Sequence, residues 1–387
     1  MKNLTYHKLS DFCKTGSGGT PSRKNSDYFN GNIPWIKSGE LKNTIIIDSE
    51  EKISESALKD SSAKLIPKNT ILIAMYGATV GQLGILGVEA ATNQAICYII
   101  PDPTICDRYY LFRFLQSNLK RFLHQRVGGA QPNISQNIIK TLKVPLPLLS
   151  TQQKITSILE KAESAKEKRK EANRLTEEFL KSVFLEMFGD PVRNPKRWKV
   201  KNISEICNIN PRLDFQISDE TEVTFMPMST VSAKGEIDTR HTKKYSEVKS
   251  GFTYFLEGDV IFAKITPCME NGKGAIVKNL KNGIGFGSTE FHVLRPMKEI
   301  KSEWLYLLLS FKHIREIAAK NMTGTAGQKR VPASFFKNFK IAVPPLSLQQ
   351  KFADIVQKVE ILKEKQKESE RELDNLFNCL MQKAFKG

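Results

Sequence analysis

The sequence has few of the residues that build metal centres and disulfide frameworks. Its 387 residues include six cysteines and five histidines, and both types are scattered along the chain. No two cysteines have the C-x-x-C spacing of zinc and redox motifs. We therefore expect no metal site and no disulfide framework, and a reducing cytoplasm is the simplest environment for such thiols.

The chain also lacks long apolar runs and the signatures of catalysis. No apolar run approaches the roughly 20 residues that span a bilayer, and residues 1–8 lack the apolar core of a signal peptide. There is no G-x-x-x-x-G-K-[ST] phosphate loop and no Asn-Pro-Pro-Tyr-type sequence for adenine methylation. We predict that this chain has no catalytic residues and no membrane partner.

Two alternatives stay open at this stage. Asp238, followed by Glu247-Val248-Lys249, weakly resembles the pattern of a metal-dependent nuclease that acts alone. Such a pattern also arises readily by chance in a chain with 41 acidic residues. The second alternative is a non-catalytic RNA-binding protein or a coiled-coil scaffold.

Positive charge is what the chain has in excess. It carries 59 Lys and Arg against 41 Asp and Glu, a formal net charge of +18, and 40% of its residues are hydrophobic. The length and the apolar content predict two or three domains with real cores. The charge favours a polyanionic partner, either nucleic acid or an anionic membrane.

The chain repeats itself at an offset of 197 residues. Residues 143–154 recur as residues 340–351, with seven of the twelve positions identical. Shorter upstream segments also match at slightly smaller offsets. Each half is a globular part followed by a long polar segment. We predict a first module (residues 1–150), a central helix (151–190), a second module (191–346) and a C-terminal helix (347–387).

Both modules have the pattern of a β-rich α/β (α+β) fold. Short apolar runs that follow turn residues predict equivalent strands in the two modules. In the first module these are residues 70–75 and 95–100, and in the second they are residues 259–264 and 290–294. Residues 109–126 and 304–321 have helical periodicity. We expect the two modules to be related by a pseudo-two-fold arrangement.

The segments after the repeated motif have the pattern of a coiled coil. Residues 151–188 and 347–386 contain no glycine or proline, and apolar residues recur at alternating spacings of three and four. A helix of this kind is about 57 Å long at about 1.5 Å per residue. The connectivity predicts an antiparallel pair in which facing residue numbers sum to about 535, so that Arg169 meets Gln366.

The positive charge is confined to the modules. The first module carries a net charge of +7 and the second +10, whereas the central and C-terminal helices carry 0 and +1. The amphipathic segments are therefore the neutral ones, which argues against a basic membrane-binding helix. Two basic modules on a neutral spacer fit a long, regular polyanion, and duplex DNA is such a ligand.

Several loops combine glycine with basic and short polar side chains, which can bind phosphates or base edges. In the first module, the candidate DNA contacts in these loops are Thr20, Ser22, Arg23, Lys24, Tyr76, Thr79, Gln82, Gln131 and Asn133. In the second module, they are Lys264, Thr266, Asn271, Lys273, Thr323, Gln328, Lys329 and Arg330. Gln131 and Gln328 are counterparts at offset 197. Equivalent loops with divergent side chains indicate one scaffold that reads two different sequences.

The order of these motifs resembles the specificity subunits of type I restriction-modification systems. Residues 19–22 and 33–41 look like the start of the family's target recognition domain, and Lys37 and Ser38 within the second segment are further DNA-contact candidates. Residues 91–95 and 287–296 look like two variants of its mid-domain motif. The repeated Pro…Gln-Gln-Lys turns and residues 184–191 resemble the ends of its spacer helices. The second module departs at its start, where residues 210–212 and 226–228 replace the Gly-Thr-Pro and Trp-Ile segments.

The resemblance implies a non-catalytic subunit that binds a bipartite, asymmetric site on double-stranded DNA. Each recognition domain would read one half-site, and the helices would fix the spacing between them. Two modification subunits that carry S-adenosylmethionine would methylate adenine at N6. Restriction subunits with ATP and magnesium would complete the nuclease, so the chain itself would need no cofactor.

Overall fold

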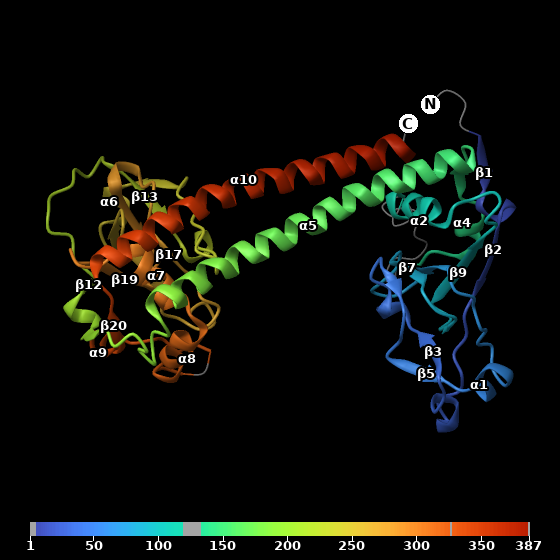
Figure 1. Ribbon diagram of the computed structural model, residues 1–387, viewed down its shortest axis with the longest axis horizontal. Helices are drawn as coiled ribbons and strands as arrows, with labels where there is room; N and C mark the ends of the chain where they lie inside the picture. The colour runs from blue at the N-terminus through green and yellow to red at the C-terminus, as the bar shows by residue number, and fades with distance from the viewer. Residues whose placement is uncertain (1–4, 119–132, 326, 386–387) are drawn as a thin grey trace. The chain divides into compact units, whose positions relative to one another are not determined.

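The computed structural model describes residues 5–118, 133–325 and 327–385. The chain divides into two compact units. Unit 1 comprises residues 1–170 with 369–387, and unit 2 comprises residues 171–368 (Figure 1). Each unit contains one globular part and a section of each of two 40-residue helices, α5 (Leu149–Phe188) and α10 (Leu346–Phe385).

Unit 1 is built from a large sheet, a small sheet and a two-stranded ribbon. In spatial order, the large sheet consists of β2 (Cys13–Ser17), β9 (Ile96–Pro101), β6 (Ile71–Ala74), β7 (Leu83–Leu86) and β4 (Ile45–Ile46). The small sheet consists of β5 (Glu51–Ile53), β3 (Ile33–Ile36) and β8 (Ala91–Thr92), and the ribbon of β1 (Tyr6–Lys8) and β10 (Lys143–Pro145). β3 and β8 are parallel neighbours.

Unit 2 repeats this plan. Its sheets are β12 (Cys207–Ile209), β19 (Phe291–Pro296), β16 (Val260–Ala263) and β17 (Gly274–Ile276), and β14 (Thr242–Lys244), β13 (Glu222–Met226), β18 (Ile284–Gly287) and β15 (Thr253–Leu256). The ribbon is β11 (Lys199–Asn202) with β20 (Lys340–Val343). β13 and β18 are again parallel. The tandem β-rich repeat expected from the sequence is therefore confirmed.

Short helices complete the units. They are α1 (Glu55–Lys59), α2 (Arg108–Ser117), α4 (Gln136–Lys140), α6 (Tyr245–Val248), α7 (Ser302–Ser310), α8 (Lys312–Lys320) and α9 (Ala333–Asn338). Single 3₁₀ turns lie at Leu9–Asp11, Ser26–Phe29, Ser38–Glu40, Ile203–Glu205, Met228–Thr230 and Lys281–Gly283.

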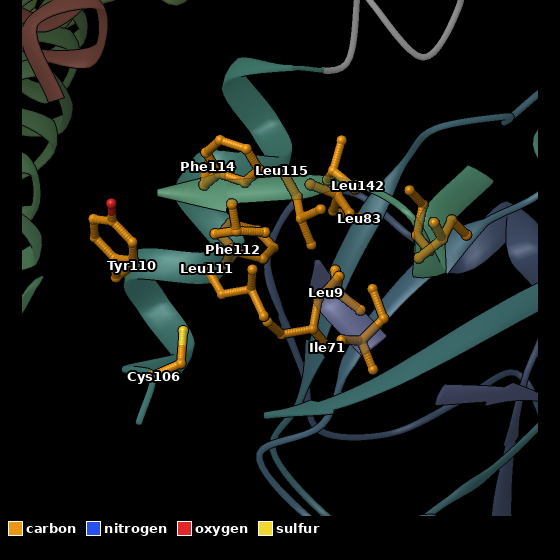
Figure 2. Packing of buried hydrophobic residues seen from close by; sticks show 14 of the residues in the cluster. Leu9, Ile71, Leu83, Cys106, Tyr110, Leu111, Phe112, Phe114, Leu115 and Leu142 are labelled. Carbon is orange, nitrogen blue, oxygen red and sulfur yellow. The ribbon is translucent and has the colours of Figure 1, made fainter. Parts of the chain in front are cut away.

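The main core of unit 1 lies between the large sheet and α2 (Figure 2). Asp107 caps α2, because its carboxylate accepts a hydrogen bond of 2.8 Å from the backbone N–H of Tyr110. The end of α10 joins this core, since the Phe385 ring lies 5.2 Å from Tyr110 and 5.8 Å from Phe114. In unit 2 the start of α10 does the same, where the buried Phe352 packs edge-to-face against Phe184 and Phe188.

The long helices pair antiparallel within each unit. In unit 1, Lys166 of α5 forms an ion pair of 2.7 Å with Asp374 of α10. In unit 2, the Gln366 amide donates a hydrogen bond of 2.9 Å to the Thr176 hydroxyl. The direction of pairing is confirmed, but the predicted register is wrong, because Gln366 meets Thr176, two turns along α5 from Arg169. Phe352 and Phe385 bind the two ends of α10 to the core of unit 2 and the core of unit 1, respectively. The spacing of apolar residues along the helices does not reveal these contacts.

One predicted helix is two helices in the structure. Residues 304–321 contain α7 and α8, and Phe311 between them takes an extended conformation with ψ of 132°. Its ring packs against Phe184 at 5.1 Å, so a contact with α5 overrides local helical periodicity. The four predicted strands are all present, as β6, β9, β16 and β19.

Candidate nucleic-acid interface

Two of the predicted contact loops lie side by side in each unit. In unit 1, Tyr76, two residues after the end of β6, forms an isolated β-bridge with Asn133, just before α4. The Ile134 N–H also donates to the Met75 carbonyl at 2.7 Å. In unit 2, Ile265 after β16 bridges Arg330, just before α9. The scaffold thus brings the same two loops together twice, and we call each combination a loop pair.

The loop pair of unit 1 contains residues 76–82 and Asn133. Gly77 and Gly81 have φ of 87° and 83°, a conformation that favours glycine and that lets the loop turn from β6 to β7. The Gln82 side chain accepts a hydrogen bond of 3.1 Å from Asn43. Asn133 is exposed and Thr79 is half-buried. The predicted contact Gln131 lies outside the described residues.

The loop pair of unit 2 contains residues 264–273 and, in a second segment, residues 323–325 and 327–330. The second segment is a small hairpin in which Thr323 and Arg330 exchange backbone hydrogen bonds of 2.9 and 2.8 Å. Gln328 and Lys329 are exposed in this hairpin. A further backbone hydrogen bond of 3.0 Å runs from Thr266 to Lys329 and joins the two segments. The structure therefore brings most second-module candidates to one place.

Some of these candidates are tied to the protein itself. The Arg330 guanidinium contacts the Glu290 carboxylate at 2.8–3.1 Å and holds the pKa of Glu290 below its usual range. The Thr266 hydroxyl donates to Glu270 at 2.6 Å, and the Lys273 ammonium donates to the Met228 carbonyl at 3.3 Å. These side chains shape the loops, whereas Asn271, Gln328 and Lys329 are exposed polar side chains.

The remaining first-module candidates lie elsewhere in unit 1. Thr20, Ser22, Arg23 and Lys24 precede β3, and Lys37 and Ser38 follow it. Figure 1 shows β3, β5 and α1 at the end of unit 1 away from α2. Thr20 donates to the Gln94 side chain. The structure therefore divides the predicted first-module site between two places, the loop pair and the small sheet.

Two of the three candidate cations of this second place are paired with acids. Arg23 contacts Glu51 at 2.6 Å, and Lys37 contacts Glu50 and Glu51 at 3.0 Å each. Arg23, followed by Lys37, lowers the pKa of Glu51 below its usual range. Arg23 also lies 4.2 Å above the Phe29 ring. DNA phosphate would therefore have to compete with carboxylates for these two side chains.

The loop pair and the small sheet also lie in parts of the module that differ in net charge. An inserted segment runs between the second strand of each module and its central strand, at residues 18–70 and 210–259. The inserted segments carry net charges of +1 and −3, and the rest of the two modules carries +6 and +13. The positive charge therefore lies in the part of each module that holds the loop pair.

The acidic pattern considered for a nuclease has other partners in the structure. Asp238 forms an ion pair of 2.7 Å with Arg240, and Lys249 forms one of 3.0 Å with Asp219. Glu247 accepts a hydrogen bond of 3.0 Å from the Lys244 N–H and so caps α6. Within residues 5–118, 133–325 and 327–385, no group of three or more His, Cys, Asp or Glu could hold a metal ion.

Sequence reasoning missed that the two repeated glutamines form hydrogen bonds with main-chain groups of their modules. Gln152 and Gln349 stand at the same position of the repeated motif, and both are completely buried. Their identity at offset 197 was the available signal, but a glutamine beside a helix start has no distinctive chemistry of its own. None of the helices in the described part of the chain has the length and the apolar character needed to cross a membrane.

The fold defines a class of protein: a chain of two repeated β-rich modules, each joined to sections of two long antiparallel helices. Comparison with protein families and solved structures identifies similar proteins. The family model described as "Type I restriction modification DNA specificity domain" matches residues 1–177 and 195–373. The chain belongs to this family and contains two copies of the domain.

Individual relatives support this assignment. Over 386 residues the chain is 25% identical to the MjaIX specificity subunit of Methanocaldococcus jannaschii, covering 92% of this chain and 86% of that protein. It is 41% identical to the EcoEI specificity subunit of Escherichia coli over 174 residues, but this match spans 44% of the chain and only 29% of the relative. The match to the EcoAI subunit, 46% identical, likewise spans 28% of that protein.

Solved structures show the same fold. One chain of a type I restriction-modification assembly aligns over 100% of this chain and 98% of its own length, with a TM-score of 0.65 and 18% identity. The S subunit of M. genitalium aligns over 99% of this chain and 96% of its own, with a TM-score of 0.57 and 15% identity.

Proposed function

We propose that this chain is the DNA specificity subunit of a type I restriction-modification complex. Each module binds one half of a bipartite, asymmetric duplex site, and the long helices set the number of base pairs between the halves. The match of the DNA specificity family to both halves of the chain is the observation that carries this proposal.

The loop pairs support a DNA interface in each module. They expose amide, hydroxyl and ammonium groups, which can contact base edges and phosphates. They lie in the part of each module that carries the positive charge, and counter-ion release from DNA would favour binding there. The side chains of the two loop pairs differ, so one scaffold would read two different half-sites.

The long helices support docking of protein partners. Several large apolar side chains on α5 and α10 are about half exposed: Ile158, Leu175, Phe179, Leu362 and Leu376. We propose that two modification subunits bind there, carry S-adenosylmethionine and methylate adenine at N6, and that restriction subunits with ATP and magnesium join them. This chain then contributes neither a cofactor nor a catalytic group, and it acts in the cytoplasm, where the DNA is.

Methylome sequencing tests the proposal. The chain is produced with the modification subunits of its host in a strain that lacks adenine methylation. We expect methylated adenines in a single bipartite motif, and none when this chain is omitted. Methylation that persists without the chain, or that follows an undivided motif, would overturn the proposal. Gel shifts of the complex on duplex DNA and on RNA then separate DNA recognition from the RNA-binding alternative.

A further inference from the structure

Each long helix is attached to its own module through a completely buried glutamine. In unit 1, the Gln152 amide nitrogen donates to the carbonyls of Ile105 and Pro147 at 3.0 and 2.9 Å. Its amide oxygen accepts from the Asp107 N–H at 2.9 Å. The hydrogen bonds with Ile105 and Asp107 connect the first turn of α5 to the loop before α2, and the one to Pro147 stays within the turn that leads into α5.

In unit 2, Gln349 makes the same three kinds of hydrogen bond. The Gln349 amide nitrogen donates to the carbonyls of Glu299 and Pro344 at 3.1 and 2.9 Å, and its oxygen accepts from the Lys301 N–H at 2.9 Å. The proline is the same in both units, whereas the other two contacted residues differ in type. All the contacts use main-chain groups, which do not depend on the side chain. The connection therefore survives the divergence of the two modules.

A second attachment lies eleven residues further along each helix. In unit 1, Arg113 of α2 binds the Glu163 carboxylate of α5 through two nitrogens. In unit 2, Lys278 after β17 contacts both oxygens of Glu360 of α10, at 2.8 and 3.1 Å. Glu163 and Glu360 are equivalent at offset 197, whereas their cations come from different elements.

The spacing of the two attachments has a geometric consequence. Eleven residues make close to three helical turns, so both attachments lie on one face and are separated by about 16 Å. A helix held at one point can pivot about it, but two points on one face fix the direction of its axis. Each module thus sets the direction in which its long helix leaves.

We propose that Gln152 with Glu163, and Gln349 with Glu360, are positioning residues that set the base-pair spacing of the recognised site. They contact no DNA and act by fixing the direction of each helix relative to its module. This inference rests on the proposed function. It goes beyond that function because it assigns spacer discrimination to four named side chains of the module–helix joints, separately from the loop pairs that read sequence.

The test uses the full-length chain assembled with its modification subunits. The double variant Glu163→Gln, Glu360→Gln removes the charge of both second attachments at half-exposed sites, so folding is retained. The matched control is Glu160→Gln, Glu364→Gln, with the same changes at exposed positions on the same helices. Binding is measured on duplexes that have the native spacer and spacers one base pair shorter and longer.

We expect the double variant Glu163→Gln, Glu360→Gln, here called the joint variant, to lose spacer discrimination: its preference for the native spacer over the shorter and longer ones should fall by about fivefold or more. The half-site sequences that it recognises should stay unchanged. The control should keep the native preference. An unchanged spacer preference in the joint variant would overturn the proposal. A stronger variant, Gln152→Glu with Gln349→Glu, should lower discrimination further, because a carboxylate cannot donate to the two carbonyls.

A measurement without DNA separates this inference from the proposed function. Spin labels at Lys68→Cys and Lys168→Cys, in a Cys379→Ser background, report the distance between the first module and α5 within unit 1. Glu163→Gln should broaden the distance distribution, and Glu160→Gln should not. Distance distributions of equal width would contradict the positioning role of Glu163, even if DNA recognition holds. Failure of the unmodified complex to recognise a bipartite site would instead overturn the proposed function and leave the distance result standing.

Discussion

The inserted segment of each module and the rest of its fold differ in charge and in how their cations are used. Arg23, Lys37, Lys244 and Lys249 of the inserted segments form ion pairs with nearby acids. The rest of the modules carries +6 and +13, and its exposed loop pairs hold polar groups such as Lys329 and Gln328. Glycine-rich basic loops thus occur in both parts, but only the loop pairs lie in strongly positive surroundings.

The largest expected effect comes from reversing charge in a loop pair. Lys264→Glu with Lys329→Glu should weaken duplex binding by on the order of 100-fold at moderate salt and lower the salt slope by about two, because phosphate contacts are lost. The matched control, Arg212→Glu with Lys249→Glu, makes the same charge change in the inserted segment. Binding titrations at several salt concentrations measure both. Equal losses in the two variants would contradict the distinction between the two parts.

The next largest effect is expected from substitution of the buried glutamines, and it concerns stability. Gln152→Leu leaves one N–H and two carbonyls of unit 1 without their partner, which should cost about 1–3 kcal/mol of unfolding free energy. Gln349→Leu should cost unit 2 a similar amount. Gln153→Leu, at the exposed neighbour, should change stability by less than about 0.5 kcal/mol. Urea unfolding compares the three, and a Gln153 effect as large as that of Gln152 would show that the buried hydrogen bonds contribute little.

The two units should also respond differently to acid. The Nε2–H of His292 in β19 donates to the Val331 carbonyl at 2.7 Å, and its Nδ1 accepts from the Asn210 side-chain amide at 3.2 Å. Burial lowers the pKa of His292 below the usual range. The unfolded chain then binds a proton more readily, so the stability of unit 2 should fall as pH drops below about 6.5. The equivalent residue of unit 1 is Cys97, whose pKa burial raises to about 12.

Hydrogen exchange at pH 7 and pH 5 measures this difference unit by unit. Each unit of pKa shift corresponds to about 1.4 kcal/mol. Opening of unit 2 should become easier at pH 5 relative to unit 1, and His292→Gln should remove most of the change. A pH response that survives this substitution would assign the effect to other groups, of which Glu290 and Lys264 are the charged neighbours.

The smallest effect tests the paired cations of the inserted segment. Glu51→Gln releases Arg23 and Lys37 from part of their pairing, so duplex affinity should rise two- to threefold if these cations reach DNA phosphate. Glu55→Gln, at an exposed position of the same inserted segment, makes the same change of charge and is the control. Fluorescence anisotropy at low salt measures the difference. An unchanged affinity would confine DNA contact in the first module to its loop pair.

Much of the fold followed from the sequence because the chain presents it twice. The glycine- and proline-free windows predicted the long helices, and the match of residues 143–154 with 340–351 predicted the tandem organisation. Helix register could not be obtained in this way, since it depends on where Phe352 and Phe385 bind the module cores. The break at Phe311 has the same cause, a tertiary contact that the local pattern does not contain.

The candidate site was only partly predictable for a related reason. Glycine with basic residues identified the loops, and strand order then brought residues 264–273 together with residues 323–325 and 327–330. The partners of each cation are fixed by three-dimensional neighbours far along the chain, such as Glu51 for Arg23 and Glu290 for Arg330. Composition alone therefore could not separate side chains that shape a loop from those that present a free polar group.

Exchange of one module tests the central claim most directly. Residues 1–150 are replaced by the corresponding module of another family member, and the methylome of cells that carry the hybrid complex is sequenced. Independent modules predict that one half of the bipartite motif changes, while the other half and the rest of the site stay the same. A hybrid that changes both halves, or neither, would contradict the assignment of one half-site to each module.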